Sequence, residues 1–258
     1  MIQIALLLAV VLTACACSVK EDRAECPCWL KVYIDPFPGG GAVVSAYDSG
    51  LIFSSALGRE DWSGYYEATV PREFVGVTCH NVLEGHKDSG SLYRIVTGNQ
   101  ADSLYAHHAM VDCTGEGAED HARLHKQFAT VYMTFENEGG EERCPYDVRI
   151  SGNVNGMDMT TLSPHGGEFE YAPEELQPMF YQFRLPRQKD SSLSLCLYNK
   201  EDGELLDSLP LGEYIRTSGF DWNAEDLNDI VINVDFAKIG LEVNVQEWNA
   251  MEVYDVTI

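Results

Sequence analysis

A cysteine near the start of the chain is the side chain best placed for covalent chemistry. An apolar run over residues 4–12 leads into Thr13, Ala14 and Cys15. The run is shorter than the ~20 apolar residues that span a bilayer, but it has the length of a signal-peptide core. No Lys or Arg precedes it, which departs from the usual pattern. The pattern otherwise predicts a bacterial lipoprotein signal: residues 1–14 are removed, and the Cys15 thiol carries lipid that anchors the protein.

A short charged stretch follows the lipidation candidate. Lys20, Glu21 and Asp22 come shortly after Cys15. This order is similar to the surface-export signal of Bacteroidetes lipoproteins, and an ordinary solvated tether is the alternative. We therefore expect residues 15–25 to tether the protein to the outer membrane, with its body exposed on the cell surface.

The remaining cysteines are disulfide candidates, because eight cysteines suit an oxidising compartment. Lipid on Cys15 leaves an odd number, and Cys17 on the tether is expected to stay unpaired. Cys144 and Cys196 share the second half of the chain and form one candidate pair. The first half leaves the pairing open, except that the two cysteines of the Cys-Pro-Cys stretch are too close to bridge each other easily. The first-half candidates are Cys26, Cys28, Cys79 and Cys113.

Composition excludes some functions. The chain has 17 Lys and Arg against 41 Asp and Glu, a net charge of −24, and a field of that sign repels nucleic acid. The acidic stretch 221–229 lacks the Gly and Glu positions of a calcium-binding loop. The Cys-x-Cys stretch lacks the second ligand pair of a zinc site. Since the motifs of nucleophilic, metal-dependent and nucleotide-binding enzymes are also missing, we expect no catalysis and no cofactor.

The pattern along the chain is typical of β-strands. Apolar and polar residues alternate most cleanly in the second half, which predicts antiparallel sheets over one core. Glycine- and proline-rich turns separate the runs, as between residues 35 and 42. The predicted strands are 29–35, 42–47, 51–55, 65–70, 74–80, 92–96, 129–135, 193–197, 230–236 and 241–245.

A change in composition marks a domain boundary. Residues 112–126 contain glycines and acidic residues and show no regular alternation of apolar and polar residues. We predict domains over 26–118 and 119–258, with a helical turn over 118–126. His121 and His125 would share a face of that turn, solvated rather than ligating zinc.

Several stretches together resemble the fimbrillin-associated anchor family, the FimB-type minor fimbrial lipoproteins of Bacteroidetes. The resemblance implies two tandem transthyretin-like Greek-key β-sandwich domains. It also implies a role at the base of a fimbria, where the protein binds the major fimbrillin, holds the polymer to the outer membrane and ends its growth. The matching stretches are Cys15 with residues 20–23, Cys26-Pro27-Cys28-Trp29-Leu30, 126–129, 211–215, 227–230 and 245–248.

Binding to such a partner would use an open sheet edge, to which an extended segment adds a strand. Residues 252–258, with Tyr254, Val256 and Ile258 on one face, would close the second domain or join that interface. A surface glycan-binding or adhesive lipoprotein is the alternative. Exposed aromatic residues at Trp62, Tyr65 and Tyr66 would support it. A surface hydrolase is a third hypothesis, and it would require a pocket with converging carboxylates.

Two triplets look like acceptors for O-glycosylation in exported Bacteroidetes proteins. They are Asp102-Ser103-Leu104 and Asp207-Ser208-Leu209, with Ser103 and Ser208 as the candidate acceptors.

Overall fold

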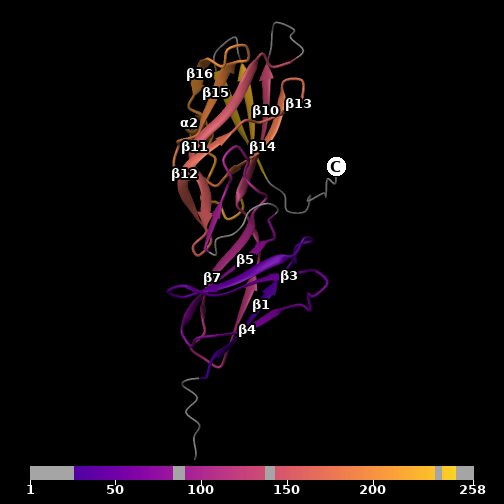
Figure 1. Cartoon of the computed structure of the whole chain (residues 1–258), viewed down its shortest axis with the longest axis vertical. Helices are drawn as coiled ribbons and strands as arrows, with labels where there is room; N and C mark the ends of the chain where they lie inside the picture. Colours follow the sequence, from indigo (N-terminus) through magenta and orange to yellow (C-terminus); the bar gives the residue numbers. More distant parts are fainter. Residues whose placement is uncertain (1–25, 84–90, 137–142, 236–239, 248–258) are drawn as a thin grey trace, which may run out of the picture.

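The protein consists of two β-sandwiches stacked end to end along its long axis (Figure 1). The computed structural model describes residues 26–83, 91–136, 143–235 and 240–247. The described chain begins at the end of the first sandwich that faces away from the second (Figure 1). Within the described residues the one helix is the short α2 (Leu211–Thr217), so the all-β tandem-sandwich expectation is confirmed.

The first sandwich packs a three-stranded sheet against a five-stranded sheet. Alternate residues of its first strand point inward, so Leu30, Val32 and Ile34 join one apolar cluster. In spatial order the smaller sheet contains β4 (Tyr66–Val70), β1 (Cys28–Ile34) and β8 (Gly117–Ala122). The larger sheet contains β3 (Leu51–Leu57), β2 (Ala42–Tyr47), β5 (Phe74–Asn81), β7 (Tyr105–Asp112) and β9 (His125–Lys126).

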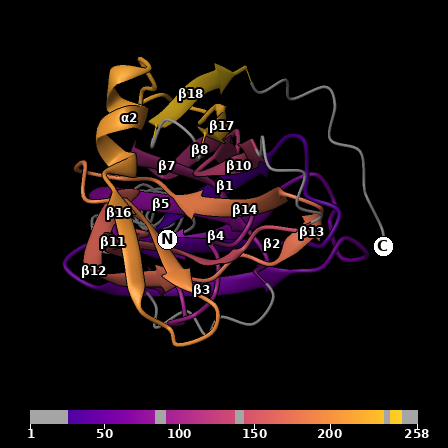
Figure 2. The same cartoon turned by 90° about the horizontal axis from the view of Figure 1, so that it is seen from above.

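The second sandwich has the larger core. Helix α2 lies along one side of it, and Figure 2 shows the helix beside β18. One sheet contains β13 (Glu175–Gln177), β14 (Phe180–Pro186), β10 (Phe128–Glu136), β17 (Asp229–Asp235) and β18 (Gly240–Gln246). The other contains β12 (Ser163–Tyr171), β11 (Tyr146–Asp158), β15 (Ser194–Asn199) and β16 (Leu205–Leu209), and β6 (Leu92–Arg94) also pairs with β11.

Two strand pairs are parallel, so the expectation of purely antiparallel sheets is wrong. β1 runs parallel to β8, from Trp29 opposite Gly117 to Ile34 opposite Ala122. β10 runs parallel to β17 in the second sandwich. Alternation reports which face of a strand is buried, but it carries no information about the direction of the neighbouring strand.

The helical turn expected over residues 118–126 is also wrong. Residues 117–122 form β8, and His125 and Lys126 form β9 in the opposite sheet. His121 stacks on Tyr33 with 4.6 Å between ring centroids, whereas His125 lies at the junction of the sandwiches. β1 is buried between two neighbours and needs a hydrogen-bonding partner on each side, and β8 supplies the second.

Over the described residues the chain passes between the two sandwiches three times, so the boundary expected after residue 118 does not describe the division. It leaves the first sandwich after β5, returns before β7, and leaves again after β9. The intervening segment 92–104 lies on the second sandwich. There the Ile95 amide donates to the Asn155 carbonyl (2.7 Å) and the Ala101 amide to the Arg184 carbonyl (3.1 Å).

The last crossing has no flexible linker. One residue, Gln127, separates β9 from β10, and its side chain is buried. Its amide donates to the Leu104 carbonyl (2.9 Å), and its carbonyl accepts from the Arg187 amide (3.3 Å). Its side-chain oxygen accepts from Arg187 Nε (3.0 Å). Because these backbone and side-chain groups are all paired, the junction is held in one geometry.

A buried ion pair fixes the same junction. The Lys126 ammonium is 1% exposed and hydrogen-bonds Asp229, which also accepts from the Thr130 amide (2.9 Å). Asp226 accepts from the Lys126 amide (2.7 Å). Burial lowers the pKa of Lys126 from its usual value, although the Asp229 carboxylate opposes that shift.

The six described disulfide candidates all carry free thiols. The pair expected between Cys144 and Cys196 is wrong. Cys144 lies in the second core, whereas Cys196 faces the other side of its sheet, with its sulfur 3.6 Å from the Ser208 hydroxyl. Neighbouring residues in a strand point to opposite faces, and Leu195 and Leu197 occupy the core face at this position.

We predict that Asp229→Ala lowers the free energy of unfolding by about 3–5 kcal/mol, because it leaves the buried Lys126 ammonium unpaired. Urea unfolding of the full chain measures the change. Glu170→Ala, which removes a half-exposed pair with Arg149, is the control and should change stability little. A loss below about 1 kcal/mol for Asp229→Ala would show that the pair does not hold the junction.

Candidate partner-binding surfaces

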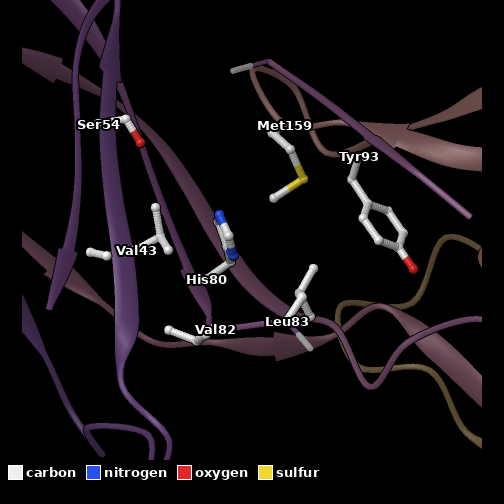
Figure 3. Close-up of a pocket in the computed structure, with 8 residues that line it drawn as sticks. Val43, Ser54, His80, Val82, Leu83, Tyr93 and Met159 are labelled. Atoms are coloured by element: carbon white, nitrogen blue, oxygen red, sulfur yellow. The ribbon is translucent and has the colours of Figure 1, made fainter. Parts of the chain in front are cut away.

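An apolar recess lies where the two sandwiches meet (Figure 3). It has a volume of about 360 Å³, and the first sandwich contributes most of its wall. The second sandwich contributes Tyr93 and Met159, and the Tyr93 hydroxyl points away from Met159 to donate to Asp102 (3.1 Å). Because the lining presents few polar groups, the recess suits an apolar side chain better than a polar substrate. The remaining lining residues are Val43, Ser54, Ala56, His80, Val82 and Leu83.

A second recess at the junction has a volume of about 510 Å³ and is rich in imidazole and guanidinium groups. Several of its ionisable side chains have partners within the fold. His107 lies 3.3 Å from Asp120, and His125 lies 3.0 Å from Asp226. Arg187 Nη1 donates to the Trp222 carbonyl (2.6 Å).

Of these contacts, the one between His125 and Asp226 joins the two sandwiches, whereas His107 contacts Asp120 within the first sandwich and Arg187 contacts Trp222 within the second. Burial and the neighbouring His107 lower the pKa of His108 below its usual value, so His108 is neutral at pH 7. The named groups are thus engaged in structural contacts within the fold.

An aromatic strip crosses the outer face of the smaller sheet of the first sandwich. The Tyr33 ring lies between Tyr65 (5.7 Å between centroids) and His121 (4.6 Å, stacked). The Lys31 ammonium sits 5.1 Å from the centre of the Tyr65 ring. Trp29, on the same face of β1, is 55% exposed. The stacked faces of Tyr33 and His121 cover each other, so the exposed rings of Trp29 and Tyr65 are the ones that could stack on a ligand with apolar faces.

Sheet edges are the other candidate surface. In the second sandwich the outermost strands are β13 and β18 in one sheet and β12 and β16 in the other. β13 spans three residues, which limits strand addition there. β16 carries two adjacent exposed leucines, Leu205 and Leu206, of which Leu206 is 50% exposed. An exposed apolar edge strand is a template for pairing with another chain.

Several predicted site residues lie outside the described residues. These are Cys15, Cys17, the export stretch Lys20, Glu21 and Asp22, and the terminal residues Tyr254, Val256 and Ile258. Among the described residues no helix is long and apolar enough to cross a membrane.

The described predictions are distributed over both sandwiches. Ser208 is exposed on β16, whereas Ser103 is partly covered at the junction. Of the three aromatic residues predicted to be exposed, Tyr65 belongs to the aromatic strip. Trp62 stacks on Phe37 (4.3 Å between centroids), and the Tyr66 hydroxyl is hydrogen-bonded to Ser55 (2.7 Å).

The sequence-based reasoning missed the junction groups. Arg187, Asp226 and Asp229 lie 60 to 103 positions from their partners Gln127, His125 and Lys126. A charged residue beside a clean strand, as in Lys126 before 128–136, is the one signal in the sequence that could have indicated a buried ion pair.

Comparison with known proteins gives matches only at the level of structure. No family model and no curated protein matches the chain. The fimbrial anchor protein Mfa2 from Porphyromonas gingivalis has a TM-score of 0.60 at 12% identity, over 86% of this chain and 98% of that one. A Bacteroides thetaiotaomicron protein described as a candidate polysaccharide-binding protein has a TM-score of 0.59 at 13% identity, over 87% and 99%.

A third match agrees with these two. A candidate adhesin from Bacteroides ovatus has a TM-score of 0.54 at 13% identity, over 88% of this chain and 96% of that one. The matches extend over nearly all of each chain, so they cover both sandwiches and the junction. The chain therefore shares its fold with a fimbrial anchor, as the resemblance to the fimbrillin-associated anchor family implies.

Proposed function

We propose that this protein is an outer-membrane lipoprotein that anchors a fimbria to the cell surface. Lipid on Cys15 holds it to the membrane, and the second sandwich binds the basal subunit of the major fimbrillin and ends polymer growth. The role is mechanical and without catalysis. One observation carries the proposal: two sandwiches form a rod with an ordered junction, and this fold matches a fimbrial anchor over nearly its whole length.

The orientation of the rod supports this assignment. The described chain begins at the far end of the first sandwich, next to the proposed tether (Figure 1). The second sandwich lies at the opposite end, where a polymer growing outward from the cell would meet it. An ordered junction transmits tension between these ends, and the Gln127 hydrogen bonds and the Lys126–Asp229 pair supply that order.

We place the contact with the fimbrial subunit at the edge of β16. Its exposed leucines, Leu205 and Leu206, would be covered by an extended segment of the subunit, whose backbone would pair with the strand. β16 is the outermost strand of its sheet and is hydrogen-bonded to β15 alone. A glycan on Ser208 would cover the same edge, so we expect Ser208 to be bare in assembled fimbriae.

Removing the lipidation site should release the protein. With Cys15→Ala we expect the protein, with any fimbriae, to move from the cell surface into the medium, because the proposed lipid is its membrane attachment. Immunoblots of cell and medium fractions measure the distribution. Cys17→Ala is the matched control and should stay on the cell. Retention of Cys15→Ala at wild-type levels would overturn the anchoring proposal.

Changing the β16 edge should weaken binding to the fimbrial subunit. For Leu205→Glu with Leu206→Glu we expect at least about tenfold weaker capture of major fimbrillin from cells that make both proteins, since two apolar side chains are lost from the contact. Leu51→Glu, an equally exposed leucine on the edge strand β3 of the first sandwich, is the control. Equal capture by both variants would place the contact elsewhere.

Binding of a surface glycan is the second candidate, and the aromatic strip favours it. Trp29 and Tyr65 would stack on sugar rings, with Tyr33 packed against Tyr65 to hold it in place, while Lys31 contributes a hydrogen bond. If so, Tyr33→Ala should abolish saturable binding to surface polysaccharide in calorimetry, with fimbrillin capture unchanged. Saturable glycan binding by a wild-type protein that recovers no fimbrial subunit would reverse the order of the two candidates.

A further inference from the structure

Two cysteines meet at the end of the first core that lies nearest the tether. Cys28 is the first residue of β1, and Cys113 directly follows β7. Both side chains are fully buried, and both belong to the first apolar cluster. Their thiols are close enough to interact electrostatically, and both are present as free thiols in this structure.

The backbone places these two residues in opposite sheets. Cys28 is opposite Val70, the last residue of β4. The Cys113 amide donates to the carbonyl of Glu73, which precedes β5 (3.0 Å). The chain between Val70 and Glu73 turns from the smaller sheet into the larger one, so one turn brings both cysteines to the same end of the sandwich. A bond between them would fasten the two sheets together.

The other described cysteines are less well placed to pair with either. Cys79 lies near Asp120, which is opposite Val32, and Val32 is four residues along β1 from Cys28, or about 13 Å. Cys144 and Cys196 belong to the second sandwich. Cys26 is exposed two residues before Cys28, and its pairing with Cys113 is the competing outcome.

We propose that Cys28 and Cys113 form a disulfide in the exported protein. The oxidant is the disulfide of a thiol–disulfide oxidoreductase. One cysteine thiolate attacks it to give a mixed disulfide, and the second cysteine displaces the enzyme as a dithiol. The two cysteines lose two protons and two electrons, and the oxidant gains them.

The chemistry of the site sets when the bond forms. Burial, together with the neighbouring Cys28, raises the pKa of Cys113 to about 12, so almost no thiolate is present at neutral pH in the closed sandwich. The thiols are also shielded from any enzyme. The exchange therefore takes place before the two sheets close, and once formed the bond is protected from reductants.

The bond has a mechanical consequence that rests on the proposed anchoring function. Tension from the tether reaches the first sandwich at Cys28. A disulfide to Cys113 would pass that tension directly to the larger sheet, in addition to the hydrogen bonds of β1 with β4 and β8. Unfolding under force is governed by the barrier to unfolding, which a covalent bond across the loaded strand raises.

Peptide mapping tests the bond without reference to fimbriae. The full chain is isolated from the envelope of cells that export it, denatured in N-ethylmaleimide and digested without reductant. We expect a linked pair of peptides that contains Cys28 and Cys113. Maleimide on both residues, or a peptide linking Cys26 to Cys113, would overturn the proposal. Capture of fimbrillin is scored separately, so a missing bond and a missing anchoring function give different results.

Thermal unfolding tests the effect of the bond on stability. Dithiothreitol, added during unfolding, should lower the Tm of the wild-type protein by roughly 5–15 °C. Cys28→Ala and Cys113→Ala should not respond to the reductant, whereas Cys79→Ala, the buried control in the same core, should keep the response. A wild-type Tm that is the same with and without dithiothreitol would contradict a stabilising bond, and this comparison needs no variant to fold.

Discussion

The architecture depends on the pairing of buried polar and charged groups at the junction between the two sandwiches. The last crossing between the sandwiches uses a single residue, Gln127, with Lys126 buried beside it. A buried ammonium costs several kcal/mol unless it is paired, and Asp229 supplies that partner. The pairing requires β9, β10 and the start of β17 to be in place at the same time. The relative position of the two sandwiches is therefore set by the same contacts that close the second core.

This constraint has a consequence for force. β1 begins at the tether end, and β8, parallel to it, continues through β9 into the second sandwich. Tension between the two ends of the rod acts along both strands, so the bonds between them share the load instead of opening one after another. An anchor under tension needs such an arrangement, whereas a protein that only binds glycan has no such requirement. The parallel strand pair and the ordered junction thus favour the proposal of fimbrial anchoring over that of glycan binding by the aromatic strip.

The strands were predicted well because each has one buried face. The strand 42–47 has the expected bounds, and β10 and β17 differ from the predicted runs by one residue at each end. The prediction failed where a partner far along the chain decided the structure. Residues 117–122 show no apolar alternation and include two acids, yet they form β8 because β1 lacks a second neighbour. The segment 92–104 joins the second sandwich because β11 and Arg184 bind its backbone.

The sequence by itself determined that the chain is all-β, that it forms two sandwiches, and that its lipidation candidate lies at the start. The all-β class follows from local composition and from a period of two, whereas the two sandwiches were implied by the resemblance to the fimbrillin-associated anchor family. The tertiary structure alone decided strand direction, the three crossings, the burial of Lys126 and the meeting of Cys28 with Cys113. Each of these depends on pairing between residues distant in the chain. The free energy of such contacts comes from burial and hydrogen bonding in three dimensions, and the order of residues in one strand does not encode it.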